Sequence, residues 1–173
     1  MTDMTYIEKI RQKAESGDPE AQCSLGEAYL RGRNLDRDYA EAMKWLRLAA
    51  DQGCARSQCH LGDMYREGKA VPRNIDEAIV WYKAAFENGY VHVALEIARM
   101  YREGTEISKN MEEAIKWFRI AAENGHDDAT EALGEIYENG EGVPRNMGEA
   151  IRWYKLAVDR SPCGKALLRL QRE

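Results

Sequence analysis

The sequence contains no hydrophobic run that approaches the roughly 18 residues needed to cross a membrane. Its first residues, Met1 to Gly17, are largely polar and lack the apolar core of a secretory signal peptide. Both absences argue against a membrane-spanning or exported chain. We therefore expect a soluble protein that resides in the cytoplasm.

The sequence also lacks the short motifs that mark common catalytic sites. Ser-x-x-Lys, Gly-x-Ser-x-Gly and phosphate-binding loops are all absent from it. A general nucleic-acid binder is expected to be strongly basic, whereas this chain has a formal net charge of -5. We therefore expect a protein that is not an enzyme, needs no cofactor and does not bind nucleic acid.

A repeat dominates the rest of the sequence. The pattern Glu-Ala-x-x-Trp occurs at Glu41, Glu77, Glu113 and Glu149, each copy 36 residues after the last, and it includes all four tryptophans. A fixed period of this length is typical of repeat proteins, whose stability comes from the stacking of neighbouring copies. The period predicts an N-terminal capping helix at 1–16, four repeats at 17–52, 53–88, 89–124 and 125–160, and a C-terminal capping helix at 161–173.

Each repeat is predicted to form two helices, which we call helix A and helix B. In the first repeat Asp18 and Pro19 are typical of a helix start, and Gly32 is typical of a helix end. Helix B follows Asp38, with Glu41 three positions later, which is the spacing of a capping box. The fold class is therefore predicted to be all-α, a right-handed α/α superhelical solenoid of helix-turn-helix repeats. Its helices are predicted near 18–31, 38–52, 54–67, 74–88, 90–103, 110–124, 126–139 and 146–159.

Small residues indicate where the helices pack closely. Helix B is expected to bury Trp45 and Leu46 and their equivalents in the other repeats. In helix A the residue after the Leu25 position is always small: Gly26, Gly62, Ala98 and Gly134. Because glycine costs about 1 kcal/mol relative to alanine inside a helix, its presence predicts a close approach of helix A to another helix.

The four cysteines could form two disulfides, but their positions argue against this. Cys23 and Cys59 occupy the same position of adjacent repeats, so we expect them on neighbouring helices about 8–10 Å apart. An unstrained disulfide needs Cα atoms within about 7 Å of each other. Free thiols, as in a reducing compartment, are therefore expected. No metal site is expected either, because Cys54, Cys59 and His60 do not converge in the predicted helices.

The repeat resembles a known family. The segments 25–29 and 42–49 follow the tetratricopeptide skeleton, with a period two residues longer. A Gly-x-x-Val-Pro-x-Asn loop at 68–74 and 140–146 accommodates the two extra residues. Together with Glu-Ala-x-x-Trp in helix B, these features resemble the Sel1-like repeat family across residues 17–160.

The resemblance implies an α/α solenoid that acts as an adaptor for a partner polypeptide. Secreted, cysteine-rich members carry disulfides between helices A and B of a repeat, a pattern that the cysteines of this chain do not follow. The same resemblance leaves two alternatives open. One is a hydrolase or thiol-dependent enzyme of the β-lactam-binding type, for which the sequence supplies no nucleophile. The other is an immunity-type protein that neutralises a toxin.

Helix geometry predicts which face binds the partner. With Leu25 directed to the core and about 100° per residue, the opposite face of helix A is expected to line the concave groove of the superhelix. That face carries arginines in repeats two and three and only acids in repeat four. The residues predicted to contact the partner are Arg56, Cys59, Arg66, His92, Leu95, Arg99, Arg102, Asp128, Glu131, Glu135 and Glu138.

The predicted groove therefore has a basic middle and an acidic C-terminal end. Cys23, Cys59 and Leu95 are expected to form an apolar seam beside the arginines. Because arginine holds carboxylates in two-point geometry, an acidic segment or a C-terminal carboxylate is the expected ligand. The acids of repeat four would repel further acidic residues and so set the end point of the bound segment.

Overall fold

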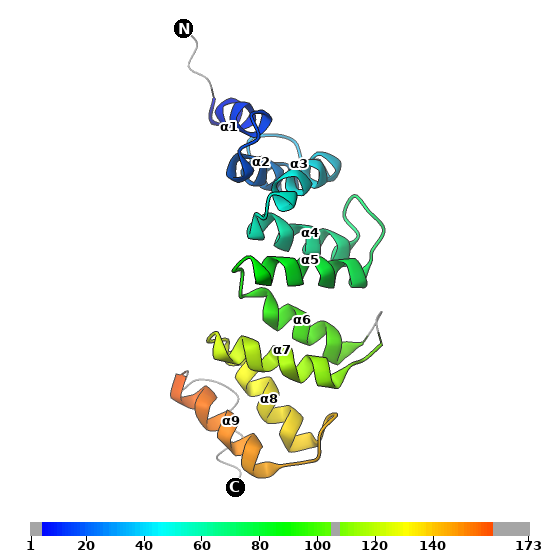
Figure 1. Ribbon diagram of the computed structural model, residues 1–173, viewed down its shortest axis with the longest axis vertical. Helices are drawn as coiled ribbons and strands as arrows, with labels where there is room; N and C mark the ends of the chain where they lie inside the picture. The colour runs from blue at the N-terminus through cyan, green and yellow to red at the C-terminus, as the bar shows by residue number, and fades with distance from the viewer. Residues whose placement is uncertain (1–4, 105–107, 161–173) are drawn as a thin grey trace. The chain divides into compact units, whose positions relative to one another are not determined.

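The computed structural model describes residues 5–104 and 108–160, and within these ranges it contains only α-helices and no strand. The chain divides into two compact units, Met1–Val93 and Ala94–Glu173. Figure 1 shows α2 beside α3 and α4 beside α5 in the first unit, and α8 beside α9 in the second. The helices are α1 (Tyr6–Glu15), α2 (Pro19–Arg31), α3 (Tyr39–Asp51), α4 (Ala55–Glu67), α5 (Ile75–Glu87), α6 (Val93–Glu103), α7 (Met111–Glu123), α8 (Asp127–Asn139) and α9 (Met147–Arg160).

These helices confirm the predicted class, an all-α helical repeat solenoid. The even-numbered helices are the predicted A helices and the odd-numbered ones from α3 onward are the predicted B helices. Their ends agree with the prediction to within one residue, except that α6 begins at Val93 instead of residue 90. A turn precedes α6, in which the Val93 N–H donates to the Tyr90 carbonyl over 3.4 Å. The predicted C-terminal capping helix lies outside the described residues.

Local capping residues set the helix starts. The Asp38 side chain accepts from the backbone N–H groups of Ala40 and Glu41 at 2.9 and 3.0 Å, and asparagine does the same in later repeats. The capping-box prediction for Glu41 is wrong, however. Its carboxylate accepts instead from the indole N–H of Trp45, at 3.1 Å, and from Lys44, at 3.3 Å. In the first repeat Glu41 thus binds the tryptophan one turn further along helix B, whereas the buried indole N–H groups of Trp81 and Trp153 have no hydrogen-bond partner among the described residues.

The glycines of helix A mark close contacts, as predicted. A Cβ atom added to Gly62 would lie 2.6 Å from Cε1 of Tyr82, which is on the B helix of the same repeat. At Gly26 the corresponding neighbour is Leu46, 2.7 Å away. Because real Cβ atoms do not approach so closely, the absence of a side chain allows the two helices of a repeat to pack together.

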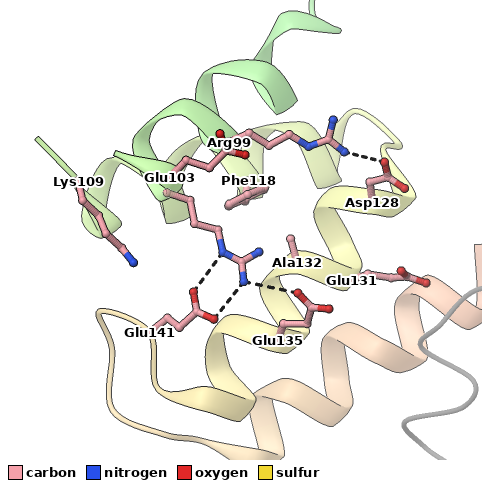
Figure 2. A pocket seen from close by; sticks show the side chains of 10 residues that line it. Arg99, Glu103, Lys109, Phe118, Asp128, Glu131, Ala132, Glu135 and Glu141 are labelled. Atoms are coloured by element: carbon pink, nitrogen blue, oxygen red, sulfur yellow. Dashed lines mark hydrogen bonds and ion pairs between the residues drawn. The ribbon is translucent and has the colours of Figure 1, made fainter. Parts of the chain in front are cut away.

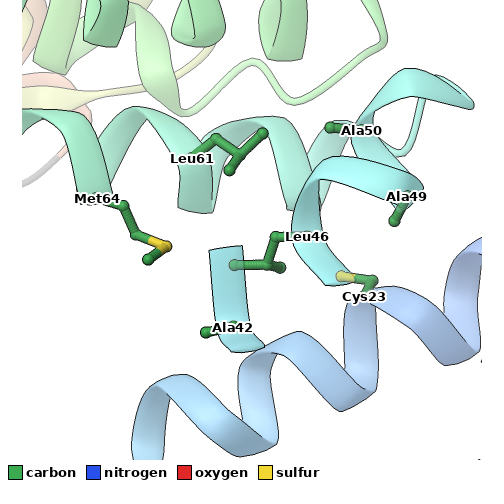
Figure 3. Close-up of a cluster of buried hydrophobic side chains, with 7 residues drawn as sticks. All are labelled: Cys23, Ala42, Leu46, Ala49, Ala50, Leu61 and Met64. Atoms are coloured by element: carbon green, nitrogen blue, oxygen red, sulfur yellow. The ribbon is translucent and has the colours of Figure 1, made fainter. Parts of the chain in front are cut away.

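The core of the first unit contains small residues from successive helices. Figure 3 shows Leu46 of α3 between side chains of α2 and α4. Trp81 is half-buried and packs against this cluster. Trp45, Trp117 and Trp153 are also half-buried, so the predicted burial of the tryptophans is only partial. The buried members of the cluster are Cys23, Ala42, Leu46, Ala49, Ala50, Leu61 and Met64.

Polar contacts connect each repeat to the next within a unit. The buried Gln58 side chain donates to the Ala50 carbonyl at 3.1 Å, which ties α4 to the end of α3. Arg47 of α3 donates to the Tyr65 hydroxyl of α4 at 3.2 Å. Equivalent arginine–tyrosine bonds join α1 to α2 and α7 to α8. These bonds fix the register of one repeat on its neighbour because each satisfies a polar group at a defined position.

Candidate partner-binding site

The residues predicted to contact a partner fall into both units, and each unit is considered by itself. In the first unit Arg56 of α4 is half-exposed and bound to acids of α2. Its guanidinium lies 2.9 Å from Glu27 and 3.1 Å from Glu20. Arg66, also on α4, pairs with Asp63 of the same helix at 3.0 Å. The positive charge of both arginines is thus matched locally by carboxylates.

Cys23 and His60 complete a polar cluster around Glu27. The Cys23 thiol accepts from Nε of Arg56 at 3.1 Å, and Nε2 of His60 lies 3.1 Å from the same Glu27 carboxylate that Arg56 contacts. The hydrogen bond with His60 lowers the pKa of Glu27. Sequence reasoning missed His60 here. The signal was its separation of 33 residues from Glu27, close to one repeat, which places the two on adjacent A helices.

The Cys23 thiol is unsuited to act as a nucleophile. Its side chain is 0% exposed, and burial raises the pKa of the thiol to about 11. A thiol is nucleophilic only as the thiolate, so Cys23 is protonated and inaccessible at neutral pH. None of the three cysteines within residues 5–104 and 108–160 forms a disulfide. In that part of the chain no group of three or more His, Cys, Asp or Glu side chains could hold a metal ion.

The predicted apolar seam does not line a groove. Cys23 belongs to the same buried cluster as Leu46 and Leu61, and Leu95 is only 8% exposed. The prediction failed because it projected one helix alone, whereas an A helix in a stack meets side chains from the B helix of its own repeat and from the next repeat. Cys59 is half-buried, and His92 is exposed with its ring edge against Tyr90.

In the second unit a cavity of about 580 Å³ brings several predicted residues together. Figure 2 shows Arg99 directed toward the carboxylate of Asp128 on α8. Arg102 binds Glu135 of α8 and Glu141 of the loop that follows it. Arg99 lies 2.8 Å from Asp128 and 3.2 Å from Glu96. The lining residues are Arg99, Arg102, Glu103, Lys109, Phe118, Asp128, Glu131, Ala132, Glu135 and Glu141.

Arg102 is held more tightly than Arg99. Its Nε and Nη2 atoms donate to the two carboxylate oxygens of Glu141 at 3.1 and 3.0 Å, and Nη2 lies 3.5 Å from Glu135. This two-point contact lowers the pKa of Glu141. Arg102 thus bridges Glu135 of α8 and Glu141 of the following loop, both of which are labelled in Figure 2. The charged side chains that line the cavity therefore hold one another in fixed orientations.

The predicted division into a basic middle and an acidic end is wrong for this unit. Asp128 and Glu135 of repeat four, together with Glu141, pair with the arginines of repeat three, so the two signs of charge are interleaved. Glu138, the last predicted acid, does not line the cavity and accepts from the Tyr154 hydroxyl at 2.6 Å. Sequence reasoning also missed Glu141. Its signal was its place directly after the helix-ending Gly140, at the start of the loop between helices A and B.

This chain consists of stacked two-helix repeats with charged side chains on helix A. It is therefore a helical repeat scaffold. A family model for the Sel1 repeat matches residues 19–54, 55–90, 92–126 and 127–161, so the chain belongs to the Sel1 repeat family. Sel1 repeat proteins generally mediate protein–protein interactions, and their scaffold is typically non-enzymatic. No helix in the described part of the chain is long and apolar enough to span a membrane.

Solved structures show the same fold. A protective antigen of uropathogenic Escherichia coli with an SLR fold is 37% identical, with a TM-score of 0.82, over 91% of this chain and 34% of that one. A Sel1 repeat protein from Oxalobacter formigenes is 28% identical, with a TM-score of 0.78, over 96% of this chain and 48% of that one. This chain thus spans less than half of either structure.

One curated relative matches over a shorter segment. The secretory immunoglobulin A-binding protein EsiB of Escherichia coli O6:H1 is 44% identical over 43 residues. This segment is 25% of the present chain and 9% of that protein. The segment is slightly longer than one 36-residue period of the repeat.

Proposed function

We propose that this chain is an interaction module that binds a partner polypeptide at the cavity lined by α6 and α8. The observation that carries the proposal is the cavity itself, about 580 Å³ in volume, whose walls are charged side chains fixed by ion pairs. Side chains that are already ordered lose less conformational entropy on binding, so more of the contact energy contributes to affinity. The name of EsiB, which binds secretory immunoglobulin A, supports a polypeptide as the class of ligand.

Filling the cavity tests this proposal without assuming the charge of the partner. In the variant Glu131→Trp an indole occupies part of the cavity. Glu123→Trp is a matched control, because Glu123 is exposed at the end of α7 and does not line the cavity. Wild type and both variants are immobilised and exposed to an extract of the source organism, and captured proteins are quantified by mass spectrometry.

We expect at least one protein to be retained by wild type and by Glu123→Trp and to fall more than tenfold with Glu131→Trp. If Glu131→Trp captures the same proteins in the same amounts, the partner does not use this cavity. Circular dichroism of each variant checks that the helices are intact. All 173 residues of the chain are used in wild type and in both variants.

A further inference from the structure

The charge of the cavity lined by α6 and α8 identifies the chemistry of its ligand. Five carboxylates and three basic side chains line it, a formal excess of two negative charges. Two of the three basic groups are already engaged: Arg99 with Asp128, and Arg102 with Glu141 and Glu135. An incoming carboxylate would have to displace these acids from the arginines and would then lie beside them. The electrostatic balance therefore opposes an acidic ligand.

We propose that this cavity receives a lysine or arginine side chain of the partner, a refinement that rests on the proposed function. Asp128, Glu131 and Glu135 lie three and four residues apart on α8, so they share one face of that helix. Ala132 lies on the same face and, being small, leaves space between the carboxylates. The cationic group of the ligand contacts the carboxylates of Glu131 and Glu135 at the mouth of this space.

The lining also accommodates the aliphatic part of a basic side chain. Phe118 and Ala132 line the cavity between the charged walls and, being 1% and 9% exposed, give it a small apolar surface, most of it from Ala132. Lysine and arginine bury their methylene groups against apolar surface while the charged end stays among polar groups. An acidic side chain is shorter and offers no comparable apolar contact. Shape and charge thus favour the same ligand, opposite in sign to the one expected from the sequence.

The experiment uses two model peptides of six residues, acetylated and amidated to remove terminal charges. One alternates lysine with glycine and the other alternates glutamate with glycine. Each is titrated into the 15N-labelled chain, and amide chemical shifts are followed by NMR, which detects weak binding. We expect the lysine peptide to produce saturable shifts at Phe118, Ala132 and Glu135, with an affinity that falls as salt is added.

Two isosteric variants make the test specific. Glu131→Gln and Glu135→Gln remove negative charge from the cavity yet leave Glu141 to hold Arg102. Combined, they should weaken binding of the lysine peptide about tenfold, the usual scale for losing a charged hydrogen-bond partner. The control Glu123→Gln should leave the affinity unchanged. Equal weakening by Glu123→Gln would overturn the proposal, because the effect would then be one of net charge alone.

Other outcomes also decide the question. Saturable shifts at the cavity with the glutamate peptide would restore the acidic ligand and overturn the proposal, and so would the absence of cavity shifts with both peptides. The proposed function fails separately, through unchanged capture by Glu131→Trp. A partner lost with Glu131→Trp, together with no response to the lysine peptide, would keep the cavity as a binding site and refute its preference for cations.

Discussion

The substitution Gly62→Ala tests the close packing of helices A and B. The added Cβ would lie 2.6 Å from Cε1, 2.7 Å from Cδ1 and 3.0 Å from Cζ of Tyr82. The ring has little room to move, because Tyr82 is 1% exposed and its hydroxyl donates to Asp63 at 2.7 Å. Overpacking of this kind costs about 1–3 kcal/mol, whereas alanine gains about 1 kcal/mol over glycine inside a helix. The difference is a net loss of about 0–2 kcal/mol, and we expect about 1 kcal/mol.

Urea unfolding followed by circular dichroism measures the effect, with Gly148→Ala as a matched control. Gly148 is exposed in the first turn of α9, and its Cβ would come no closer than 3.4 Å to Asn146. That substitution should be neutral or should stabilise the chain by up to about 1 kcal/mol. The cost of Gly62→Ala should shrink in a Tyr82→Ala background, because the contact is then missing. If Gly62→Ala is as stable as wild type, the inferred packing constraint is wrong.

Two further predictions concern titratable groups. Because burial raises the pKa of Cys23 to about 11, only about 0.1% of this thiol is ionised at pH 8. Iodoacetamide should label Cys23 only in urea, and mass spectrometry would refute this if native Cys23 reacted as fast as the half-buried Cys54. The pKa of Glu141 is lowered from its ordinary value of 4.5, chiefly by the hydrogen bond from Arg102, so its stabilisation is present above about pH 4.5 and is lost as the pH falls below that value. Glu141→Gln should therefore destabilise the chain on the order of 1 kcal/mol at pH 7 and much less at pH 3, and a difference independent of pH would contradict the assignment.

The fold could be predicted from sequence because its signals are local and repeated. Asp38 and Asn74 begin B helices because their short side chains cap backbone N–H groups three residues on. Gly32 ends α2 with a φ of 67°, which glycine adopts without strain. The start of α6 was less predictable because a turn precedes it, in which the Val93 N–H donates to the Tyr90 carbonyl. A signal that is formed by a few consecutive residues can be recognised without knowledge of the tertiary structure.

The candidate site was only partly predictable, because its contacts join residues far apart in the sequence. The face that holds Arg99, Arg102 and Glu135 was identified from helix periodicity. Their ion partners were not, since Arg102 meets Glu141 across 39 positions and Arg99 meets Asp128 across 29. The signs of the charges along one helix therefore do not predict the net charge of the cavity, because other segments of the chain contribute to its lining. Cys23 illustrates the same limit for apolar residues, since it lies in a buried cluster that includes Leu61 of the next repeat.

The arginine–tyrosine bonds between repeats have a consequence for how such a chain can change in length. Arg11 with Tyr29, Arg47 with Tyr65 and Arg119 with Tyr137 are each 18 positions apart, half of the 36-residue period. A duplicated repeat would arrive with the arginine that its successor needs and the tyrosine that its predecessor needs. None of these six residues lines the cavity of α6 and α8. The number of repeats and the ligand specificity therefore depend on different residues. Evolution or a designer can lengthen the scaffold without changing the residues that bind the ligand.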